Sequence, residues 1–418
     1  MGQLQSRSQR ASVTSTVPPR PATGGLSRET SSLTEKEDAA EMAFMTHTMN
    51  IKQWAAEEGR LAHVLAREDN TAHPYSYDPL TLPLDEDGFV ETVAADDTDG
   101  IRAFFERYGL VVIHNAIDDA ACVASRNELW DFIERQLPER DGQAAVRRDR
   151  PETWERWPSL SGLGILGNTF NLGPQLCANR QSVAVHRAFA ALFGTEQLRV
   201  NIGRSSVMRP TVNVPFPQPD GSSIMTDKPE WRSKDGEEWL HWDMNPFTGA
   251  YSSFSWYLKD AQANRGYDRL SVQAILAVSD CGPDDGGFFC CPGSHRAVRG
   301  WANRHGAAVP DSKILSPESS CQIYLSAAPD DEIRQNAQRA PIRAGSLLIW
   351  DARLAHCNYP NASSNLRMVQ YIQMIRADDP AFAPLLVDPG LLPPREQLEL
   401  TRLGRRLYGL EDWPSERS

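Results

Sequence analysis

The sequence predicts a mainly β protein with flanking helices. Two observations support this. Short β-like runs separated by turn residues dominate from about residue 198 to 376, and helical patterns lie before and after this region. Several short strands without long helices between them are typical of a barrel or a sandwich. The chain has 418 residues, of which 40% are hydrophobic, so it can bury a full core.

The strands of this core are predicted from short apolar runs between turns. A turn is indicated, for example, by the sequence Asp284-Asp285-Gly286-Gly287. After the core, residues 377–418 are expected to form a helical extension with a helix over Pro394–Leu410. The predicted strands cover Leu198–Ile202, Phe254–Leu258, Ser271–Val278, Gly287–Cys291, Ser346–Trp350 and Arg367–Ile375.

Residues 35–197 are expected to be mostly helical and to share one domain, 35–418, with the β core. Apolar residues at mixed three-four spacing predict a helix over 33–68, and an amphipathic pattern predicts another that begins at Gly100. The apolar run Leu110–Ile113 then predicts a buried strand. Asp118 is expected to open a further helix that runs to Leu137.

Residues 1–34 are predicted to be a disordered, basic tail, because they are rich in Ser, Thr, Pro, Arg and Gly. The first six residues fit the N-myristoylation pattern with Gly2 as acceptor, and a single acyl chain gives only weak membrane anchoring. A plain disordered tail or an organelle-targeting sequence is the alternative. The net charge of −12 argues against nucleic acid as a partner. No apolar run is long enough to span a membrane, so we expect a soluble, cytoplasmic protein.

The seven cysteines do not predict a disulfide framework or a zinc cluster, since their number is odd and no CxxC pair occurs. Buried, reduced thiols in an intracellular protein are expected instead. Among the nine histidines, His295 is predicted to be structural, while His186 and His305 are expected at the surface.

The sequence His241-Trp242-Asp243 is the central chemical feature. Alternate side chains of a strand point the same way, so His241 and Asp243 can face one cavity with Trp242 on the other side. Two histidines and one carboxylate are the ligand set that suits non-haem Fe(II) oxygenases. An ordinary hydrogen-bonded pair is the alternative. The pattern His-x-Asp is weak evidence alone, and the prediction depends on the residues that accompany it.

His356 is the best third ligand, because it follows the apolar strand that ends in Trp350-Asp351. Arg367 stands eleven positions later and opens the next strand-like run. A buried arginine needs an anion, and the guanidinium matches a carboxylate with two parallel hydrogen bonds. The carboxylate of 2-oxoglutarate would satisfy it, and an internal acid is the alternative. Arg204, near the strand before the first motif, is a further candidate for binding the cosubstrate or substrate.

Taken together, these motifs resemble the phytanoyl-CoA dioxygenase family of double-stranded β-helix oxygenases. The resemblance rests on His241-x-Asp243, on His356 with Arg367, on the run Gly286–His295, and on the helix and strand over Phe104–Ile113. It covers about residues 100–376. The resemblance implies a double-stranded β-helix (jelly-roll, cupin-like) core over 198–376 and a single catalytic domain over 35–418. It also implies that Asn358 and Trp256 help to line the cosubstrate pocket.

The resemblance further implies an Fe(II)- and 2-oxoglutarate-dependent dioxygenase that oxidises a small organic molecule with O₂ and releases succinate and CO₂. Related halogenases lack the carboxylate ligand, so Asp243 favours hydroxylation or a desaturation or demethylation built on the same step. The alternatives are a catalytically silent binding or scaffold protein on the same fold, and a cupin-type enzyme that uses another metal without a 2-oxo acid. The substrate stays open among acyl-CoA, terpenoid, alkaloid-like and amino-acid molecules.

Overall fold

The protein is described here from a computed structural model. The described residues are 77–140, 142–159, 162–166, 172–201, 203–234, 239–243, 270–305, 323–324, 332–378 and 389–414. They all belong to one compact unit, Glu41–Ser418. The predicted N-terminal tail, the predicted helix over 33–68 and the predicted strand Phe254–Leu258 lie outside the described residues.

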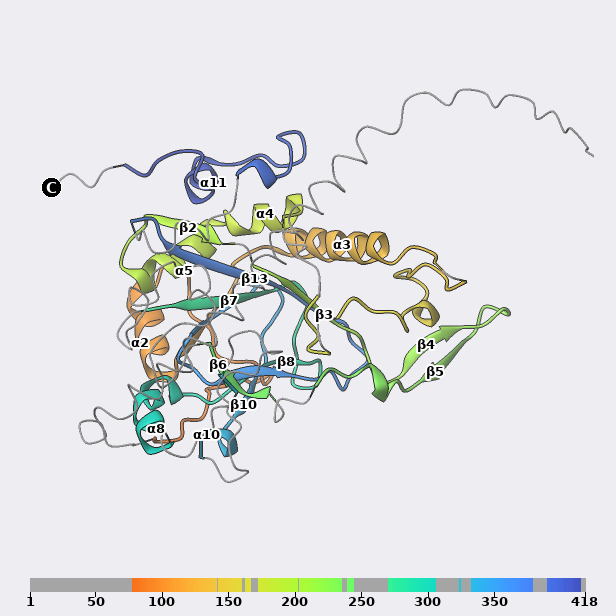
Figure 1. Ribbon diagram of the computed structural model, residues 1–418, viewed down its shortest axis with the longest axis horizontal. Helices are drawn as coiled ribbons and strands as arrows, with labels where there is room; N and C mark the ends of the chain where they lie inside the picture. The colour runs from red at the N-terminus through yellow and green to blue at the C-terminus, as the bar shows by residue number, and fades with distance from the viewer. Residues whose placement is uncertain are drawn as a thin grey trace, which may run out of the picture. The chain divides into compact units, whose positions relative to one another are not determined.

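Two antiparallel sheets form the core (Figure 1). The larger sheet has the order β1 (Leu110–Ile113), β11 (Leu347–Asp351), β7 (Val272–Ala277), β13 (Arg367–Arg376) and β2 (Leu198–Asn201), and β3 (Ser205–Met208) also pairs with β13. The smaller sheet has the order β10 (Gln338–Ala340), β8 (Gly287–Cys290), β12 (His356–Tyr359), β6 (His241–Trp242) and β9 (Ile323–Tyr324).

The chain alternates between these sheets. It passes from β7 in the larger sheet to β8 in the smaller one, and then from β11 to β12 and back to β13. A chain that winds between two facing antiparallel sheets in this way forms a double-stranded β-helix, or jelly roll. The predicted fold class, mainly β with flanking helices around a jelly-roll core, is confirmed. Strand β1 comes from the mostly helical N-terminal part, which therefore contributes an edge strand to the core.

Side chains of both sheets meet in one apolar layer between them. Val369 and Ile275 of the larger sheet pack there with Phe288 and Cys290 of the smaller one. The opposite face of the larger sheet packs against helices through a second cluster, which includes Leu276 and Ile349. Strands buried on both faces are expected to be continuously apolar, which explains the runs from which β1, β7 and β11 are predicted.

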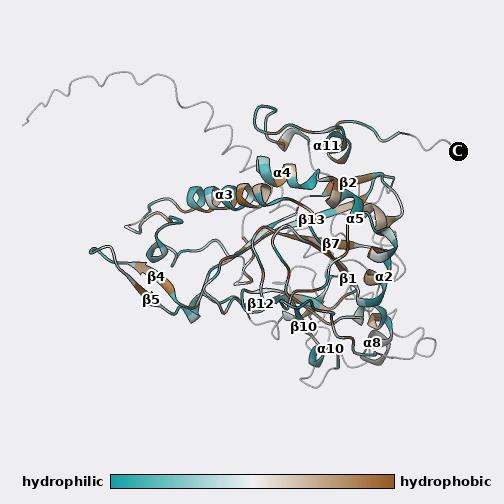
Figure 2. Ribbon diagram, turned by 180° about the vertical axis from the view of Figure 1, so that it is seen from behind, coloured by the Kyte–Doolittle hydropathy of each residue, from teal (hydrophilic) through white to brown (hydrophobic). Residues whose placement is uncertain are grey.

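Helices cover the outer face of the larger sheet (Figure 1). Figure 2 shows hydrophobic colour concentrated in strands such as β1 and β7, while helix α3 carries both hydrophilic and hydrophobic residues. The helices on this side are α2 (Thr98–Tyr108), α3 (Asp119–Gln136), α4 (Pro174–Arg180) and α5 (Val183–Phe193). The remaining described helices are α8 (Val298–His305), α10 (Glu332–Gln335) and α11 (Arg402–Leu407), with 3₁₀ turns at Pro151–Thr153, Pro229–Trp231, Ser294–Arg296 and Pro389–Leu391.

The helix predicted to begin at Gly100 and the strand predicted over Leu110–Ile113 are confirmed, as α2 and β1. Asp97 caps α2 by accepting a hydrogen bond from the backbone of Gly100. Gly109 ends the helix in the left-handed conformation, at φ 79°. A Cβ at this glycine would lie 2.5 Å from Nδ1 of His295, so both the backbone and the neighbour require glycine. The turn therefore delivers β1 directly to the edge of the larger sheet.

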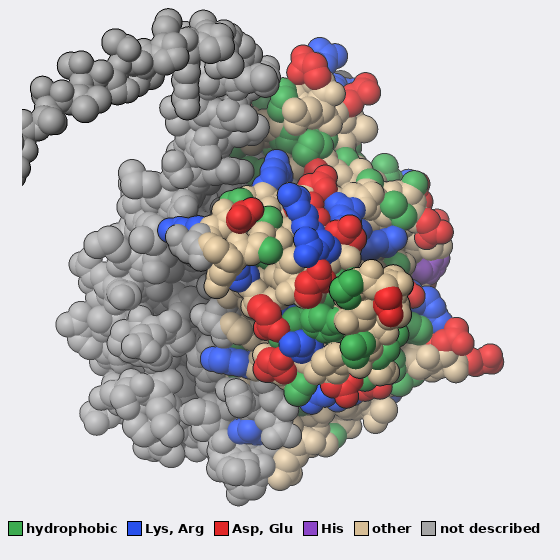
Figure 3. All heavy atoms as spheres, turned by 90° about the vertical axis from the view of Figure 1, so that its right-hand side faces the viewer, with side chains coloured by type: hydrophobic (Ala, Val, Ile, Leu, Met, Phe, Trp, Pro, Cys, Tyr) green, Lys and Arg blue, Asp and Glu red, His purple; other side chains and the backbone are tan. Residues whose placement is uncertain are grey.

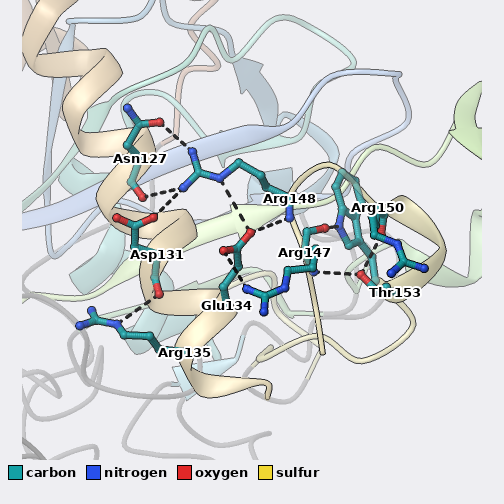
Figure 4. A network of polar contacts seen from close by, with 9 residues as sticks. Asn127, Asp131, Glu134, Arg135, Arg147, Arg148, Arg150 and Thr153 are labelled. Atoms are coloured by element: carbon teal, nitrogen blue, oxygen red, sulfur yellow. Dashed lines mark hydrogen bonds and ion pairs between the residues drawn. The ribbon is translucent and has the colours of Figure 1, made fainter. Parts of the chain in front are cut away.

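Helix α3 begins as predicted, with Asp118 as its N-cap. Its C-terminal half is tied to the segment 147–153 by the polar network in Figure 4. Arg148 forms an ion pair with Asp131 at 2.7 Å, and its backbone N–H donates to Glu134. These groups are mostly exposed, and exposed ion pairs contribute little each, about 0–1 kcal/mol. The network positions the segment more than it stabilises the protein.

Between β3 and β6 the chain forms a hairpin of β4 (Val214–Pro217) and β5 (Ser223–Thr226). Two predictions differ from the structure. The predicted C-terminal helix over Pro394–Leu410 is wrong in extent, because α11 starts only after its N-cap Thr401. The prediction for His186 is also wrong, since it is buried and stacks on Trp413 with ring centroids 5.7 Å apart.

Other surface and cysteine features agree with the sequence. In the face shown in Figure 3, acidic and basic side chains are interspersed. No helix among the described residues combines the length and the hydropathy that crossing a membrane requires. The six described cysteines are buried and form no disulfide, as predicted, and Cys321 lies outside the described residues.

Candidate metal centre

Strand register brings two of the predicted ligands together. In the smaller sheet, β12 lies between β6 and β8, and His356 is directly opposite His241. Directly opposite residues of an antiparallel pair point to the same face, so both imidazoles lie on one side of the sheet. Their ring centroids are 4.6 Å apart. His356 also contacts the inner apolar layer, where its ring stacks on Phe288 at 5.4 Å, so this side is the interior.

Asp243 completes the cluster from just beyond the end of β6. Its backbone N–H donates to the carbonyl oxygen of Ala352 at 3.2 Å. Its Oδ1 lies 3.7 Å from Nε2 of His241 and its Oδ2 lies 3.3 Å from Nε2 of His356. One ligand atom from each of the three residues lies within 4.8 Å of the others, and all three residues are buried. The structure thus gathers the predicted triad.

Backbone hydrogen bonds orient both imidazoles. Nδ1 of His241 bonds the carbonyl oxygen of Trp239 at 2.9 Å, and Nδ1 of His356 bonds that of Leu354 at 2.9 Å. A carbonyl oxygen can only accept, so each Nδ1 carries a proton, and in the neutral form of each ring the lone pair is on Nε2. This is the tautomer in which histidine binds a metal through Nε2. In both cases the accepting carbonyl belongs to the residue two positions before the histidine.

The protonation states suit metal binding. Burial lowers the pKa of His356 to about 4, although Asp243 beside it opposes the shift. The imidazole is therefore neutral near pH 7. Burial raises the pKa of Asp243, but the neighbouring His356 and His241 outweigh this effect and lower it overall. A neutral His356 and an ionised carboxylate are the forms that act as ligands.

Aromatic side chains enclose the cluster. His356 lies between Phe288 and Trp350, whose ring centroid is 5.2 Å away. Trp239 stacks on His241 at 5.4 Å and with an interplanar angle of 17°. Trp242 points to the opposite side of the smaller sheet and packs edge-on against Trp301, as the alternation of side chains predicts. The walls next to the triad are therefore apolar.

Arg367 lies at the start of β13 and is completely buried. Its Nη1 donates to Oγ of Ser206 at 2.7 Å, and its Nη2 is 3.5 Å from Oδ1 of Asn358, while Nε has no hydrogen-bond partner among the described residues. Cys281 is also a neighbour, but burial raises the pKa of this thiol to about 11, so it is neutral. Among the described residues, no carboxylate pairs with Arg367, which argues against the alternative of an internal acid.

The remaining residues predicted for the cosubstrate pocket are Asn358, Arg204 and Trp256. Asn358 lies on β12 two positions after His356, and its Nδ2 donates to the hydroxyl of Tyr371 at 3.2 Å. Arg204 lies between β2 and β3, where its carbonyl oxygen accepts a bond from the backbone of Tyr371. Trp256 lies outside the described residues. A role for any of them toward the cosubstrate stays a prediction.

Several residues at the site were not predicted. Gln273 on β7 donates a hydrogen bond to Oδ2 of Asp243, and Ser206 on β3 holds Arg367. Phe288 stacks on His356. A single glutamine or serine in a strand matches no motif, so the sequence carries no signal for these two. Phe288 lies within the run Gly286–His295, and its position in that run was the available clue.

Comparisons with known proteins agree with this arrangement. The family model described as Phytanoyl-CoA dioxygenase (PhyH) matches residues 237–369, a span that includes the triad and Arg367. A relative from Dictyostelium discoideum, named "Putative phytanoyl-CoA dioxygenase", is 23% identical over 330 residues, which cover 70% of this chain and 85% of that protein.

Solved structures similar to this chain include the epimerase SnoN in complex with Fe³⁺, alpha-ketoglutarate and nogalamycin RO. It is 17% identical, with a TM-score of 0.39, and the match covers 70% of this chain and 90% of SnoN. EvdO2 from Micromonospora carbonacea var. aurantiaca, complexed with 2-oxoglutarate, is 14% identical with a TM-score of 0.38, and the match covers 74% of this chain and 100% of EvdO2.

Proposed function

We propose that this chain belongs to the phytanoyl-CoA dioxygenase family of iron- and 2-oxoglutarate-dependent oxygenases, whose model matches residues 237–369, and that it hydroxylates a small organic molecule and releases succinate and CO₂. The observation that carries the proposal is the buried cluster of His241, Asp243 and His356, with its ligand atoms within 4.8 Å of one another.

The cluster fits Fe(II) in its donor set. In this proposal the two Nε2 atoms and one carboxylate oxygen hold the metal, which is the two-histidine, one-carboxylate set of non-haem iron oxygenases. The Nδ1 bonds of His241 and His356 to backbone carbonyls fix the tautomer that this requires. The lowered pKa of His356 also means that no proton has to be displaced from it near pH 7.

Arg367 is proposed to bind the distal carboxylate of 2-oxoglutarate. A buried guanidinium without a carboxylate partner among the described residues is costly, and a dicarboxylate ligand supplies the missing charge. Ser206 and Asn358 hold the guanidinium in place before the ligand arrives. Asn358, Arg204 and Trp256 are proposed to contribute to the same pocket.

With both bound, Fe(II) and 2-oxoglutarate would supply the electrons that activate O₂ for attack on a C–H bond, while the 2-oxo acid is oxidised to succinate and CO₂. The chain's own contribution is binding, orientation and exclusion of water. Phe288, Trp350 and Trp239 pack around the two histidines and keep water from the metal ligands. Because Asp243 occupies the position that related halogenases leave without a carboxylate, the proposal is hydroxylation, or desaturation or demethylation that begins with the same step.

The test is succinate formation by purified protein with Fe(II), O₂ and 2-oxoglutarate, first without substrate and then with a panel of acyl-CoA, terpenoid, alkaloid-like and amino-acid candidates. Product masses distinguish hydroxylation from desaturation. We expect slow succinate release without substrate and a faster rate with the right one, both lost in His241→Ala. Protein that binds 2-oxoglutarate with iron but never forms succinate would instead be the silent scaffold. Metal binding without any response to 2-oxoglutarate would indicate the cupin-type alternative.

A cytoplasmic location with weak membrane anchoring through a myristoylated Gly2 is proposed from the first six residues. Intact-mass measurement after expression in a eukaryote tests it. A mass that retains Met1, or that lacks the acyl group on Gly2, would remove the anchor.

A further inference from the structure

Gln273 reaches the metal cluster from the opposite sheet. It lies on β7 in the larger sheet, directly across from Trp350 of β11, whereas β6 and β12 with the two histidines belong to the smaller sheet. Its Nε2 donates a hydrogen bond to Oδ2 of Asp243. This contact therefore crosses the interior of the jelly roll and ties the carboxylate to the sheet that does not carry it.

Asp243 depends on such a contact more than the histidines do. His241 and His356 lie on paired strands, and each ring is fixed by a backbone carbonyl. Asp243 lies beyond the end of β6, and its backbone bond of 3.2 Å to Ala352 does not by itself fix the orientation of the carboxylate. A hydrogen bond from a rigid strand restricts that orientation.

We propose that Gln273 is a positioning residue that holds Asp243 for binding a metal through one oxygen. Gln273 donates to Oδ2 and leaves Oδ1, which lies 3.7 Å from Nε2 of His241, without that bond. A carboxylate that binds iron through both oxygens occupies an extra coordination position. The proposed reaction needs three positions for 2-oxoglutarate and O₂, so single-oxygen binding keeps them open. Outer groups that orient a ligand in this way contribute to metal affinity.

This inference rests on the proposed function, because it assigns a role at the same metal site. The test is titration of the metal-free, full-length protein with Co(II), with the Co(II) absorption spectrum as the readout. The unfolding midpoint of the metal-free protein is measured separately, as a readout of stability. The variant is Gln273→Met, which keeps the length and approximate volume of the side chain but cannot donate. Gln370→Met is the matched control, since Gln370 is fully buried on β13 and bonds Asn179 and Leu176 rather than Asp243.

We expect Gln273→Met to raise the Co(II) dissociation constant by roughly 10- to 100-fold, in line with the loss of an outer contact to a metal ligand. The Co(II) spectrum should change as well, because the freed carboxylate can bind through both oxygens. Gln370→Met should lower the unfolding midpoint of the metal-free protein and leave the Co(II) dissociation constant and spectrum unchanged. A role in stability alone would give Gln273→Met the same pattern as Gln370→Met.

Gln273→Met that binds Co(II) within about twofold of the unmodified protein, with an unchanged spectrum, overturns the proposal. If Gln273→Met does not fold, Gln273→Asn, whose amide is one methylene too short to reach Asp243, is judged by the same two readouts. The proposed function fails separately, if the unmodified protein binds no metal or releases no succinate. If the unmodified protein binds metal and the Gln273 variant binds it equally well, only the role of Gln273 is excluded.

Discussion

Replacing Arg367 by methionine should weaken 2-oxoglutarate binding without lowering the stability of the folded protein. In the structure, the guanidinium is fully buried, and its Nε has no hydrogen-bond partner in the part of the chain that the structure describes. Its other contacts survive its removal. The hydroxyl of Ser206 still donates to the carbonyl oxygen of Gly164 at 2.6 Å, and Asn358 still donates to Tyr371. Arg367→Met therefore leaves neither neighbour without a hydrogen bond, and the metal-free protein should be at least as stable as before.

The loss should appear in cosubstrate binding. Removing one partner of a buried, hydrogen-bonded charge pair costs about 3–5 kcal/mol. At about 1.4 kcal/mol for each tenfold change, this raises the dissociation constant of 2-oxoglutarate by roughly a hundred- to several-thousand-fold. Arg367→Lys keeps the charge but loses the two-pronged geometry, so its effect should be smaller, about tenfold. Neither change touches a group of the metal cluster.

The assay is succinate release as a function of 2-oxoglutarate concentration at saturating Fe(II). Thermal unfolding with Mn(II), with and without 2-oxoglutarate, gives a second readout, since a ligand stabilises the folded state by an amount that grows with the logarithm of its concentration relative to its dissociation constant. We expect Arg367→Met to lose the stabilisation by 2-oxoglutarate and to keep that by Mn(II). A 2-oxoglutarate requirement within about twofold of the unmodified enzyme would refute the assignment of Arg367.

Three further predictions follow from the described residues. His241→Ala and Asp243→Ala should each abolish succinate release while circular dichroism shows an intact fold, and full activity in either would mean that the site is misassigned. Burial lowers the pKa of His295 from 6.5 to about 4, so the unfolded chain takes up a proton that the folded protein excludes, and stability falls as the pH drops from 6.5 toward 4. This costs about 3 kcal/mol by pH 4, measured by urea unfolding, and His295→Gln should flatten the slope; an unchanged slope would exclude His295 as its source. Gly109→Ala should destabilise the protein by about 2–4 kcal/mol, because the glycine is in the left-handed region and its Cβ would lie 2.5 Å from His295. Gly88→Ala, at φ 83° with no atom within 4 Å of the added Cβ, should cost only about 1 kcal/mol, and equal losses in the two variants would contradict the role of the contact.

The sequence predicts best those elements whose residues do nothing except pack. The run Leu110–Ile113 is apolar at every position and fully buried. One face of this strand packs against the helices and the other lies in the apolar layer between the two sheets. Strand β12 was not predicted, since His356, Asn358 and Tyr359 interrupt any apolar pattern with polar groups. Strand β3 was missed for the same reason, because Ser205 and Ser206 begin it. Strands β7 and β13 were predicted although they carry Gln273 and Arg367, because the other residues of both strands are mostly apolar.

The limits of the site prediction have a similar cause. His241, Asp243 and His356 belong to a motif, and so their types and spacing point to one chemistry. Gln273 is close to Asp243 only because β7 and β6 belong to facing sheets, and this depends on tertiary structure. His186 was placed at the surface although its neighbours Val185, Ala188 and Phe189 are apolar. The segment containing Trp413 covers it, and that contact joins residues far apart in the chain.

Iron content after anaerobic loading tests the central claim most directly. Protein dialysed against Fe(II) without oxygen, then freed of unbound metal, should retain a single iron per chain, and His356→Ala prepared in parallel should retain almost none. Equal iron in both proteins, or none in the unmodified one, would contradict a metal centre built from His241, Asp243 and His356.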